Sequence, residues 1–267
     1  MATARSVVLN GDLGSGKTTV SSLLARRLGM RRISIGDLYR QMARQRGMTA
    51  LELNLHAELD DKIDHGVDQL QDDIAASGEH VVVDSRLAWF FFRDALKVHL
   101  VTDPATAAHR VLDRATDSVE RYASEAEARQ RLAQRSESER VRFIERYGAD
   151  KTRLRNYDLV CDSSRATPEE IVARIVEALA TPSGGTRLFV DPRRIHQIPG
   201  RRADAGPLRL GYARPHFFVV DGQHAVAAAI RAGHPLVPAI LAAEADEPID
   251  GYGAAAYFAM HCQTATL

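Results

Sequence analysis

The first 180 residues alternate between short apolar runs and longer amphipathic stretches. Five apolar runs have the length and content of buried strands: residues 7–9, 33–35, 81–83, 98–101 and 159–161. After the first of these, an apolar stripe over residues 18–28 predicts a helix that ends at Gly29. Thr167, Pro168 and Glu170 form a helix-start signature ahead of a later stripe. This alternation predicts an α/β fold, with a parallel sheet flanked by helices.

Charged residues dominate the stretch from residue 110 to residue 147, which is dense in Arg and Glu and poor in strand formers. Such a pattern is typical of a solvated helical pair or of a mobile helical lid. The charges alone favour the helical pair. The motifs described below favour the lid instead.

A run of helix breakers, Thr-Pro-Ser-Gly-Gly at residues 181–185, predicts a domain boundary. We therefore expect a first domain over residues 1–182, with about residues 110–147 as its lid. The short strand candidates and single good helix that follow predict a small α+β domain over residues 186–245. Residues 246–267 form a tail to which the pattern assigns no role.

The composition is that of a globular protein: 267 residues, 45% hydrophobic and 26% charged, with 35 basic and 35 acidic side chains. This balance argues against a broad basic surface for nucleic acid or membranes. Cys161 and Cys262 lack the spacing of a zinc site or a disulfide framework, which fits a reducing cytoplasm. Neither the apolar core of a secretory signal nor a span of ~20 apolar residues is found. We expect a cytoplasmic protein whose partners are small molecules, and a homodimer stays open.

A phosphate-binding loop stands between the first predicted strand and the helix that follows it. The sequence Gly-Asp-Leu-Gly-Ser-Gly-Lys-Thr at residues 11–18 matches G-x-x-x-x-G-K-S/T at every specified position. In this context backbone N–H groups can wrap the phosphates, Lys17 can reach the β and γ oxygens, and the Thr18 hydroxyl can hold Mg²⁺. We expect ATP or GTP, with Mg²⁺, at these residues: Gly11, Gly14, Ser15, Gly16, Lys17, Thr18 and Thr19.

Two further strand ends carry a carboxylate and a guanidinium. Ser34, Asp37 and Arg40 follow the second predicted strand, while Asp84 and Arg86 follow the third. Ligands of open α/β sheets bind at the carboxyl ends of the strands, and arginine suits a phosphate or carboxylate. Asp37 as a simple helix cap and Arg40 as a solvent-facing residue are the alternatives, but two such motifs together favour a site.

In order, the motifs resemble the archaeal type of cytidylate kinase, within the nucleoside-monophosphate kinases, over about residues 5–180. They are the phosphate loop, Ser-Ile-Gly-Asp-Leu-Tyr-Arg at 34–40, Asp-Ser-Arg-Leu-Ala at 84–88, Arg-Ser-Glu-Ser-Glu-Arg at 135–140, Arg-Tyr-Gly at 146–148 and Tyr-Asp-Leu-Val at 157–160. The resemblance implies that Ser34, Asp37 and Arg40 face the acceptor nucleotide and that Arg86 takes its phosphate. It also implies lid arginines that close over the transferring group, for which we choose Arg114, Arg135 and Arg140.

One departure from this family concerns the acceptor. The family usually has Glu-Gly-Arg where this chain has Asp84-Ser85-Arg86, and Trp-Phe-Phe-Phe follows at residues 89–92. We expect Asp84 beside Thr18 at the magnesium ion. If the acceptor is instead an alcohol of a nucleoside-like or other small metabolite, Asp37 or Asp84 would be the general base. Core packing of the aromatic run is favoured over stacking on a ligand.

The C-terminal part carries a second resemblance. Residues 190–195, 217–229 and 232–240 are similar to the N-terminal domain of the ParB partition proteins, shared with sulfiredoxin and a free-serine kinase. That fold implies a phosphate-binding turn at a helix start, here with His224 as a substrate-binding residue. Ala225 stands where the family has arginine, so a structural role, a gating role and phosphate binding stay open. A nucleotide-binding regulator that uses this domain to contact a partner is the non-enzymatic alternative.

Overall fold

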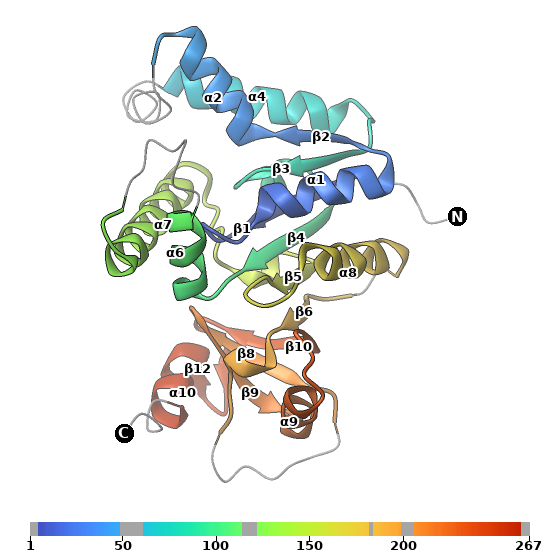
Figure 1. Cartoon of the computed structure of the whole chain (residues 1–267), viewed down its shortest axis with the longest axis vertical. Helices are drawn as coiled ribbons and strands as arrows, with labels where there is room; N and C mark the ends of the chain where they lie inside the picture. Colours follow the sequence, from blue (N-terminus) through green and yellow to red (C-terminus); the bar gives the residue numbers. More distant parts are fainter. Residues whose placement is uncertain (1–4, 49–60, 114–121, 182–183, 199–205, 263–267) are drawn as a thin grey trace.

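The computed structural model describes residues 5–48, 61–113, 122–181, 184–198 and 206–262. Its first half forms the expected alternation of strands and helices (Figure 1). The elements are β1 (Val7–Gly11), α1 (Lys17–Leu28), β2 (Arg31–Ser34), α2 (Ile35–Gln45), α4 (Asp61–Ala76), β3 (Val81–Asp84), α5 (Ala88–Phe91), β4 (Leu96–Val101), α6 (Pro104–Asp113), α7 (Glu125–Tyr147), β5 (Leu159–Asp162) and α8 (Pro168–Ala180). All five predicted strands are confirmed.

The C-terminal part is built mostly of strands. It comprises β6 (Arg187–Val190), β7 (Ile195–His196), β8 (Arg209–Ala213), β9 (His216–Asp221), α9 (Gln223–Arg231), β10 (Val237–Glu244), β11 (Pro248–Ile249), β12 (Tyr252–Gly253) and α10 (Ala254–His261). Two 3₁₀ turns, Leu154–Asn156 and Pro192–Arg194, complete the described elements. The expected tail thus contains a helix, α10.

Local signals explain where the helices begin and end. Gly29 ends α1 in the left-handed conformation at φ 64°, as its position predicts. The Thr167 side chain and the Glu170 side chain form a reciprocal capping box at the start of α8. Ile35, predicted as strand, begins α2 instead, because the Ser34 hydroxyl accepts a hydrogen bond from the backbone N–H of Asp37 and caps the helix.

Within the described residues, ten strands form one sheet in the order β2-β3-β1-β4-β5-β6-β10-β8-β9-β7. The strands β2, β3, β1, β4, β5 and β6 run parallel. Helices α1 and α8 pack together on one face of these parallel strands (Figure 1). Because the strands are parallel, the carboxyl ends of β1, β2 and β3 lie at one edge, which is where the phosphate loop starts.

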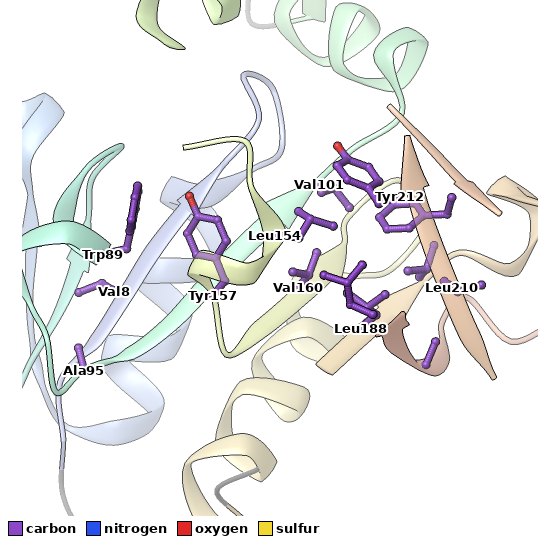
Figure 2. Packing of buried hydrophobic residues seen from close by; sticks show 14 of the residues in the cluster. Val8, Trp89, Ala95, Val101, Leu154, Tyr157, Val160, Leu188, Leu210 and Tyr212 are labelled. Carbon is purple, nitrogen blue, oxygen red and sulfur yellow. The ribbon is translucent and has the colours of Figure 1, made fainter. Parts of the chain in front are cut away.

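The sheet runs on across the segment in which we expected a domain boundary. Strand β6 pairs with β5 in parallel, and β10 then pairs with β6 in antiparallel. Leu188 of β6 and Leu210 of β8 belong to the same buried cluster as Val101 and Val160 (Figure 2). The N- and C-terminal parts therefore share both a sheet and an apolar core.

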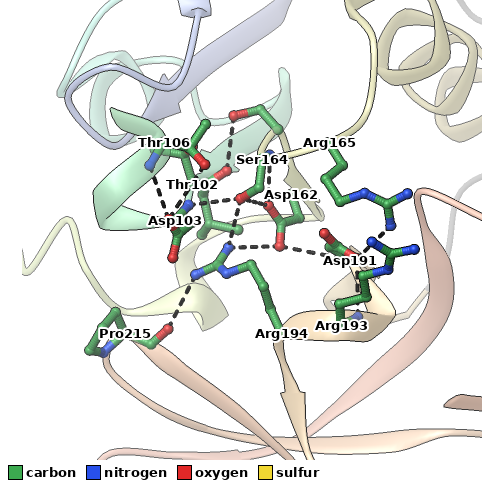
Figure 3. A network of polar contacts seen from close by, with 12 residues as sticks. Thr102, Asp103, Thr106, Asp162, Ser164, Arg165, Asp191, Arg193, Arg194 and Pro215 are labelled. Atoms are coloured by element: carbon green, nitrogen blue, oxygen red, sulfur yellow. Dashed lines mark hydrogen bonds and ion pairs between the residues drawn. The ribbon is translucent and has the colours of Figure 1, made fainter. Parts of the chain in front are cut away.

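A polar network joins the same two parts at the ends of β4 and β5. Arg194 donates hydrogen bonds to the Asp162 carboxylate at 2.7 Å and to the carbonyl of Pro215 at 3.4 Å (Figure 3). Asp162 is fully buried, so this guanidinium supplies the partner that a buried carboxylate needs.

None of the described helices is long and apolar enough to cross a membrane.

Candidate active site

The phosphate loop has the backbone that its glycines predict. Gly14 and Gly16 adopt φ angles of 81° and 79°, in the left-handed region that favours glycine. A Cβ atom at Gly16 would meet no atom within 4 Å, so that side of the loop is open to a ligand. The buried Ser15 hydroxyl has no hydrogen-bond partner among the described residues, and Thr19 is exposed next to the loop. An open cradle with an unused polar atom fits phosphate groups.

Lys17, the first residue of α1, folds back over the loop. Its Nζ atom donates hydrogen bonds to the carbonyl of Gly11 at 2.7 Å and to that of Asp12 at 3.2 Å. Burial is the main cause that lowers the pKa of Lys17 from 10.5 to about 8. A bound phosphate would raise the pKa of Lys17 again, because an anion favours the charged ammonium.

The residues expected at the magnesium ion lie next to each other. The Thr18 hydroxyl donates to the Oδ2 atom of Asp84 at 3.3 Å, and Asp84 is 7% exposed. One hydroxyl and one carboxylate fit Mg²⁺, which binds few protein oxygens and completes its shell with phosphate and water. The described residues contain no cluster of three or more His, Cys, Asp or Glu that could hold a metal by themselves.

Arg32, which was not among the expected site residues, links Asp84 to Asp37, a residue that we expect to face the acceptor. Its guanidinium donates to Asp84 Oδ2 at 3.1 Å and to the Ser21 hydroxyl at 2.8 Å, and lies 3.5 Å from Asp37 Oδ2. The period of two in a strand places Arg32 on the same face as Ser34, and this signal could have identified it.

The residues of α2 that we expect to face the acceptor lie close together. Arg40 donates a short hydrogen bond to Asp37, and both side chains are about half exposed. Burial alone would raise the pKa of Asp37, but the hydrogen bonds from Arg40 and Ser34 outweigh it and lower the pKa. The cap of α2 is Ser34, so the Asp37 carboxylate is available for the arginines rather than for the helix end.

Four charged residues, which we call the Glu139 cluster, gather near the loop: Glu139, Arg86, Arg135 and Lys151. The Glu139 carboxylate accepts hydrogen bonds from Arg86 at 2.5 Å, from Lys151 at 2.6 Å and from Arg135 at 3.2 Å. Burial opposes the charge of Glu139, but the three cations prevail and lower its pKa to about 2. The structure thus brings Arg86 and Arg135 together. It adds Glu139, which belongs to the motif at residues 135–140, and Lys151, for which the rarity of lysine in this chain was the sequence signal.

The other expected residues are not among the hydrogen-bond partners given above for Glu139. Arg140 pairs with Glu137 and with Asp150, the latter at 3.0 Å. Arg114 lies outside the described residues. His224 of α9 lines a cavity of about 730 Å³ together with Arg187 and His234. Helix α9 lies in the C-terminal part of the molecule, away from α1 (Figure 1).

The aromatic run after Arg86 packs mainly in the core. Trp89 and Phe92 are 7% and 4% exposed, and Trp89 meets the Tyr157 ring edge-on. Phe90 is 41% exposed and lies against Tyr147 of α7. Core packing is therefore confirmed for Trp89 and Phe92.

Comparisons with known proteins agree with this geometry. A family model described as an AAA domain matches residues 7–152. The cytidylate kinase of Natronomonas pharaonis is 37% identical over 175 residues, which cover 65% of this chain and 88% of that protein. The cytidylate kinase of Archaeoglobus fulgidus is 34% identical over 174 residues, which cover 65% of this chain and 93% of that protein. An uncharacterized protein from Eubacterium ventriosum shares the fold, with a TM-score of 0.51, 17% identity and coverage of 66% of this chain and 98% of that chain.

The phosphate loop at the edge of a parallel sheet and these matches define a P-loop phosphotransferase that uses ATP and Mg²⁺. The N-terminal two thirds of the chain belong to the same family as the archaeal cytidylate kinases.

Proposed function

We propose that this enzyme transfers the γ-phosphoryl group of ATP to a nucleoside monophosphate, with CMP as the preferred acceptor. The observation that carries the proposal is the extent of the similarity: relatives named cytidylate kinase match over 88% and 93% of their own length. Arg40, which pairs with Asp37, and Arg86, which pairs with Glu139, would supply the charge that an acceptor phosphate needs, and this supports the same reaction.

Phosphoryl transfer needs charge neutralisation and in-line positioning rather than covalent help from the protein. Lys17 and the backbone of the loop would bind the donor phosphates, while Thr18 and Asp84 would hold Mg²⁺. The bound ion neutralises charge on the phosphate oxygens. Arg32 keeps the Asp84 carboxylate in place, since it donates to the same oxygen as Thr18 does.

The acceptor would lie between α2 and α7. Ser34, Asp37 and Arg40 would face the nucleotide, and Arg86 would take its phosphate. Arg114, Arg135 and Arg140 would close over the site from the lid and exclude water that would otherwise hydrolyse ATP. The C-terminal part, with the ParB-like pattern and His224, would either support the structure of this site or bind a separate ligand.

Initial rates with CMP, UMP, AMP and cytidine test the proposal. We expect CMP to have the highest kcat/KM and cytidine to be inactive. Arg86→Lys is expected to raise the KM for CMP about tenfold or more, because lysine does not reproduce the bidentate fork. Arg26→Lys, at an exposed position on α1, is the matched control.

Two results would contradict the proposal. Phosphorylation of cytidine that is unaffected by Arg86→Lys and by Arg40→Lys would identify a hydroxyl kinase. Slow ATP hydrolysis with every acceptor would instead indicate a nucleotide-binding regulator.

A further inference from the structure

The most unusual group near the loop is the ammonium of Lys151. This side chain is 10% exposed, and its Nζ atom lies 2.6 Å from the Glu139 carboxylate. An ammonium carries three N–H donors. Among the described residues, Glu139 is the one hydrogen-bond acceptor of this ammonium, and the Phe143 ring lies 5.8 Å away. A buried cation with donors left over is suited to an anionic ligand.

The backbone of Lys151 is fixed to the strand that leads into the phosphate loop. The Tyr157 hydroxyl donates to the carbonyl of Lys151 at 2.8 Å. The same hydroxyl accepts a short hydrogen bond from Asn10, the residue directly before Gly11. Two hydrogen bonds thus connect Lys151 to the end of β1.

Electrostatics place Lys151 within range of the loop lysine. Burial is the main cause of the lowered pKa of Lys17; the carboxylates of Asp84 and Asp12 act to raise it, and the charges of Arg86 and Lys151 lower it further. Lys151 and Arg86 therefore lie close enough to Lys17 for their charges to act on it. Cations grouped in this way stabilise the phosphates that meet during transfer.

We propose that Lys151 binds a phosphate group in the transfer site and that Glu139 is the positioning residue that holds it there. This rests on the proposed function, which brings a donor phosphate and an acceptor phosphate to this place. Lys151 donates hydrogen bonds to phosphate oxygens and makes no covalent bond. The Glu139 carboxylate accepts a hydrogen bond from one of the three N–H groups of Lys151. This contact keeps the ammonium charged and fixes its position, so that the other two N–H groups can bind the phosphate.

Calorimetric titration of two variants tests the proposal. Glu139→Gln leaves Lys151 charged, and the double variant Glu139→Gln with Lys151→Met removes that charge while it restores the net charge of the wild type. Each protein is titrated with ATP–Mg²⁺ and, separately, with CMP. We expect the double variant to bind one of these ligands about tenfold or more weakly than Glu139→Gln does, because a charge-assisted hydrogen bond to phosphate is lost. Weaker ATP–Mg²⁺ binding identifies the donor phosphate, and weaker CMP binding identifies the acceptor phosphate.

Lys97→Met is the control, since Lys97 is the second residue of β4 and so lies at the amino ends of the parallel strands, opposite to the carboxyl ends that carry the phosphate loop. Its affinity for both ligands should equal that of the wild type. If the Met variant does not fold, the double variant with Lys151→Gln takes its place, since two amides can hydrogen-bond each other.

Equal affinities of the double variant and Glu139→Gln for both ligands would overturn the proposal and leave Lys151 a structural partner of Glu139. The titration with ATP–Mg²⁺ does not depend on the acceptor. An enzyme that binds ATP–Mg²⁺ but does not phosphorylate CMP would therefore refute the proposed function, while the titration with ATP–Mg²⁺ would still decide whether Lys151 binds the donor phosphate.

Discussion

Arg214, in the turn between β8 and β9, donates a hydrogen bond to the hydroxyl of Ser136 on α7 at 2.9 Å. The same guanidinium lies 3.5 Å from Glu137 on that helix. Helix α7 also carries Arg135 and Glu139. Arg214, a residue of the C-terminal part, therefore contacts the helix that we expect to close over the phosphates. The C-terminal part is thus in a position to affect phosphoryl transfer without contacting the substrate.

Arg214→Ala is expected to lower kcat about threefold to tenfold, because the helix that carries Arg135 loses one of its supports. The melting temperature should change little, since half-exposed ion pairs contribute about 1 kcal/mol or less. Steady-state kinetics and a thermal melt check this. Arg231→Ala, at the exposed end of α9, is the control, and equal effects of the two variants on kcat would argue against a link to α7.

Lys17→Ala is expected to reduce turnover by about 100-fold or more, because it removes the positive charge that the loop presents to the β and γ phosphates. The fold should persist, as the ammonium is bound only to the carbonyls of Gly11 and Asp12 among the described residues. Circular dichroism and a rate measurement test both statements. A folded variant with near-normal rates would show that the loop is not the donor site.

The buried side chain of His99 should make the folded protein less stable at acidic pH. Its ring is 5% exposed, hydrogen-bonded to Asn10 at 3.1 Å and packed against Tyr157. Burial lowers the pKa of His99 from 6.5 to about 4. Between these values the unfolded chain binds the proton and the folded chain does not, so the free energy of unfolding falls as the pH drops from 6.5 to 4. A shift of this size corresponds to a loss of up to about 3 kcal/mol.

Urea unfolding of the wild type and of His99→Asn at pH 7, 5.5 and 4.5 measures this effect. The variant should lose less stability over that range, whatever its stability at pH 7. The carboxylate of Glu139 titrates in a lower window, since its pKa falls from 4.5 to about 2, and its contribution is lost below pH 4.5. Parallel pH curves for the two proteins would exclude His99 as the cause.

Local sequence signals predicted the parallel strands and the loop because both depend on neighbouring residues. An apolar run predicts a buried strand, and the glycines and Lys17 of the loop follow one another directly. The partners of the site are different. Arg32 reaches Asp84, and Lys151 reaches Glu139, only once strands and helices have packed. The period of two in the strand places Arg32 on the face of Ser34, but no local rule names Asp84 as its partner or pairs Lys151 with Glu139. The continuation of the sheet from β5 to β6 is likewise a long-range pairing that the breaker-rich segment between them conceals.

That pairing leads to a prediction about the C-terminal part. Removal of residues 182–267 should destabilise the kinase half, because β6 covers the edge of β5 and Leu188 and Val190 are fully buried in the shared core. The burial of each such side chain contributes about 1.5–3 kcal/mol. The exposed β5 edge should also promote aggregation. Size-exclusion chromatography and a thermal melt of the truncated chain measure both effects.

Glu244→Gln tests the same dependence without removing a strand. The Glu244 carboxylate, at the end of β10, is 2% exposed and accepts hydrogen bonds from the backbone N–H groups of Leu154 at 2.7 Å and Arg155 at 3.0 Å. An amide oxygen accepts more weakly than a carboxylate and offers one acceptor atom in place of two, so we expect a loss of about 2 kcal/mol in the free energy of unfolding. Glu169→Gln, at an exposed position in the first turn of α8, is the control and should lose much less. A truncated chain that melts with the full-length protein, together with an unchanged Glu244→Gln variant, would show that residues 1–181 fold on their own.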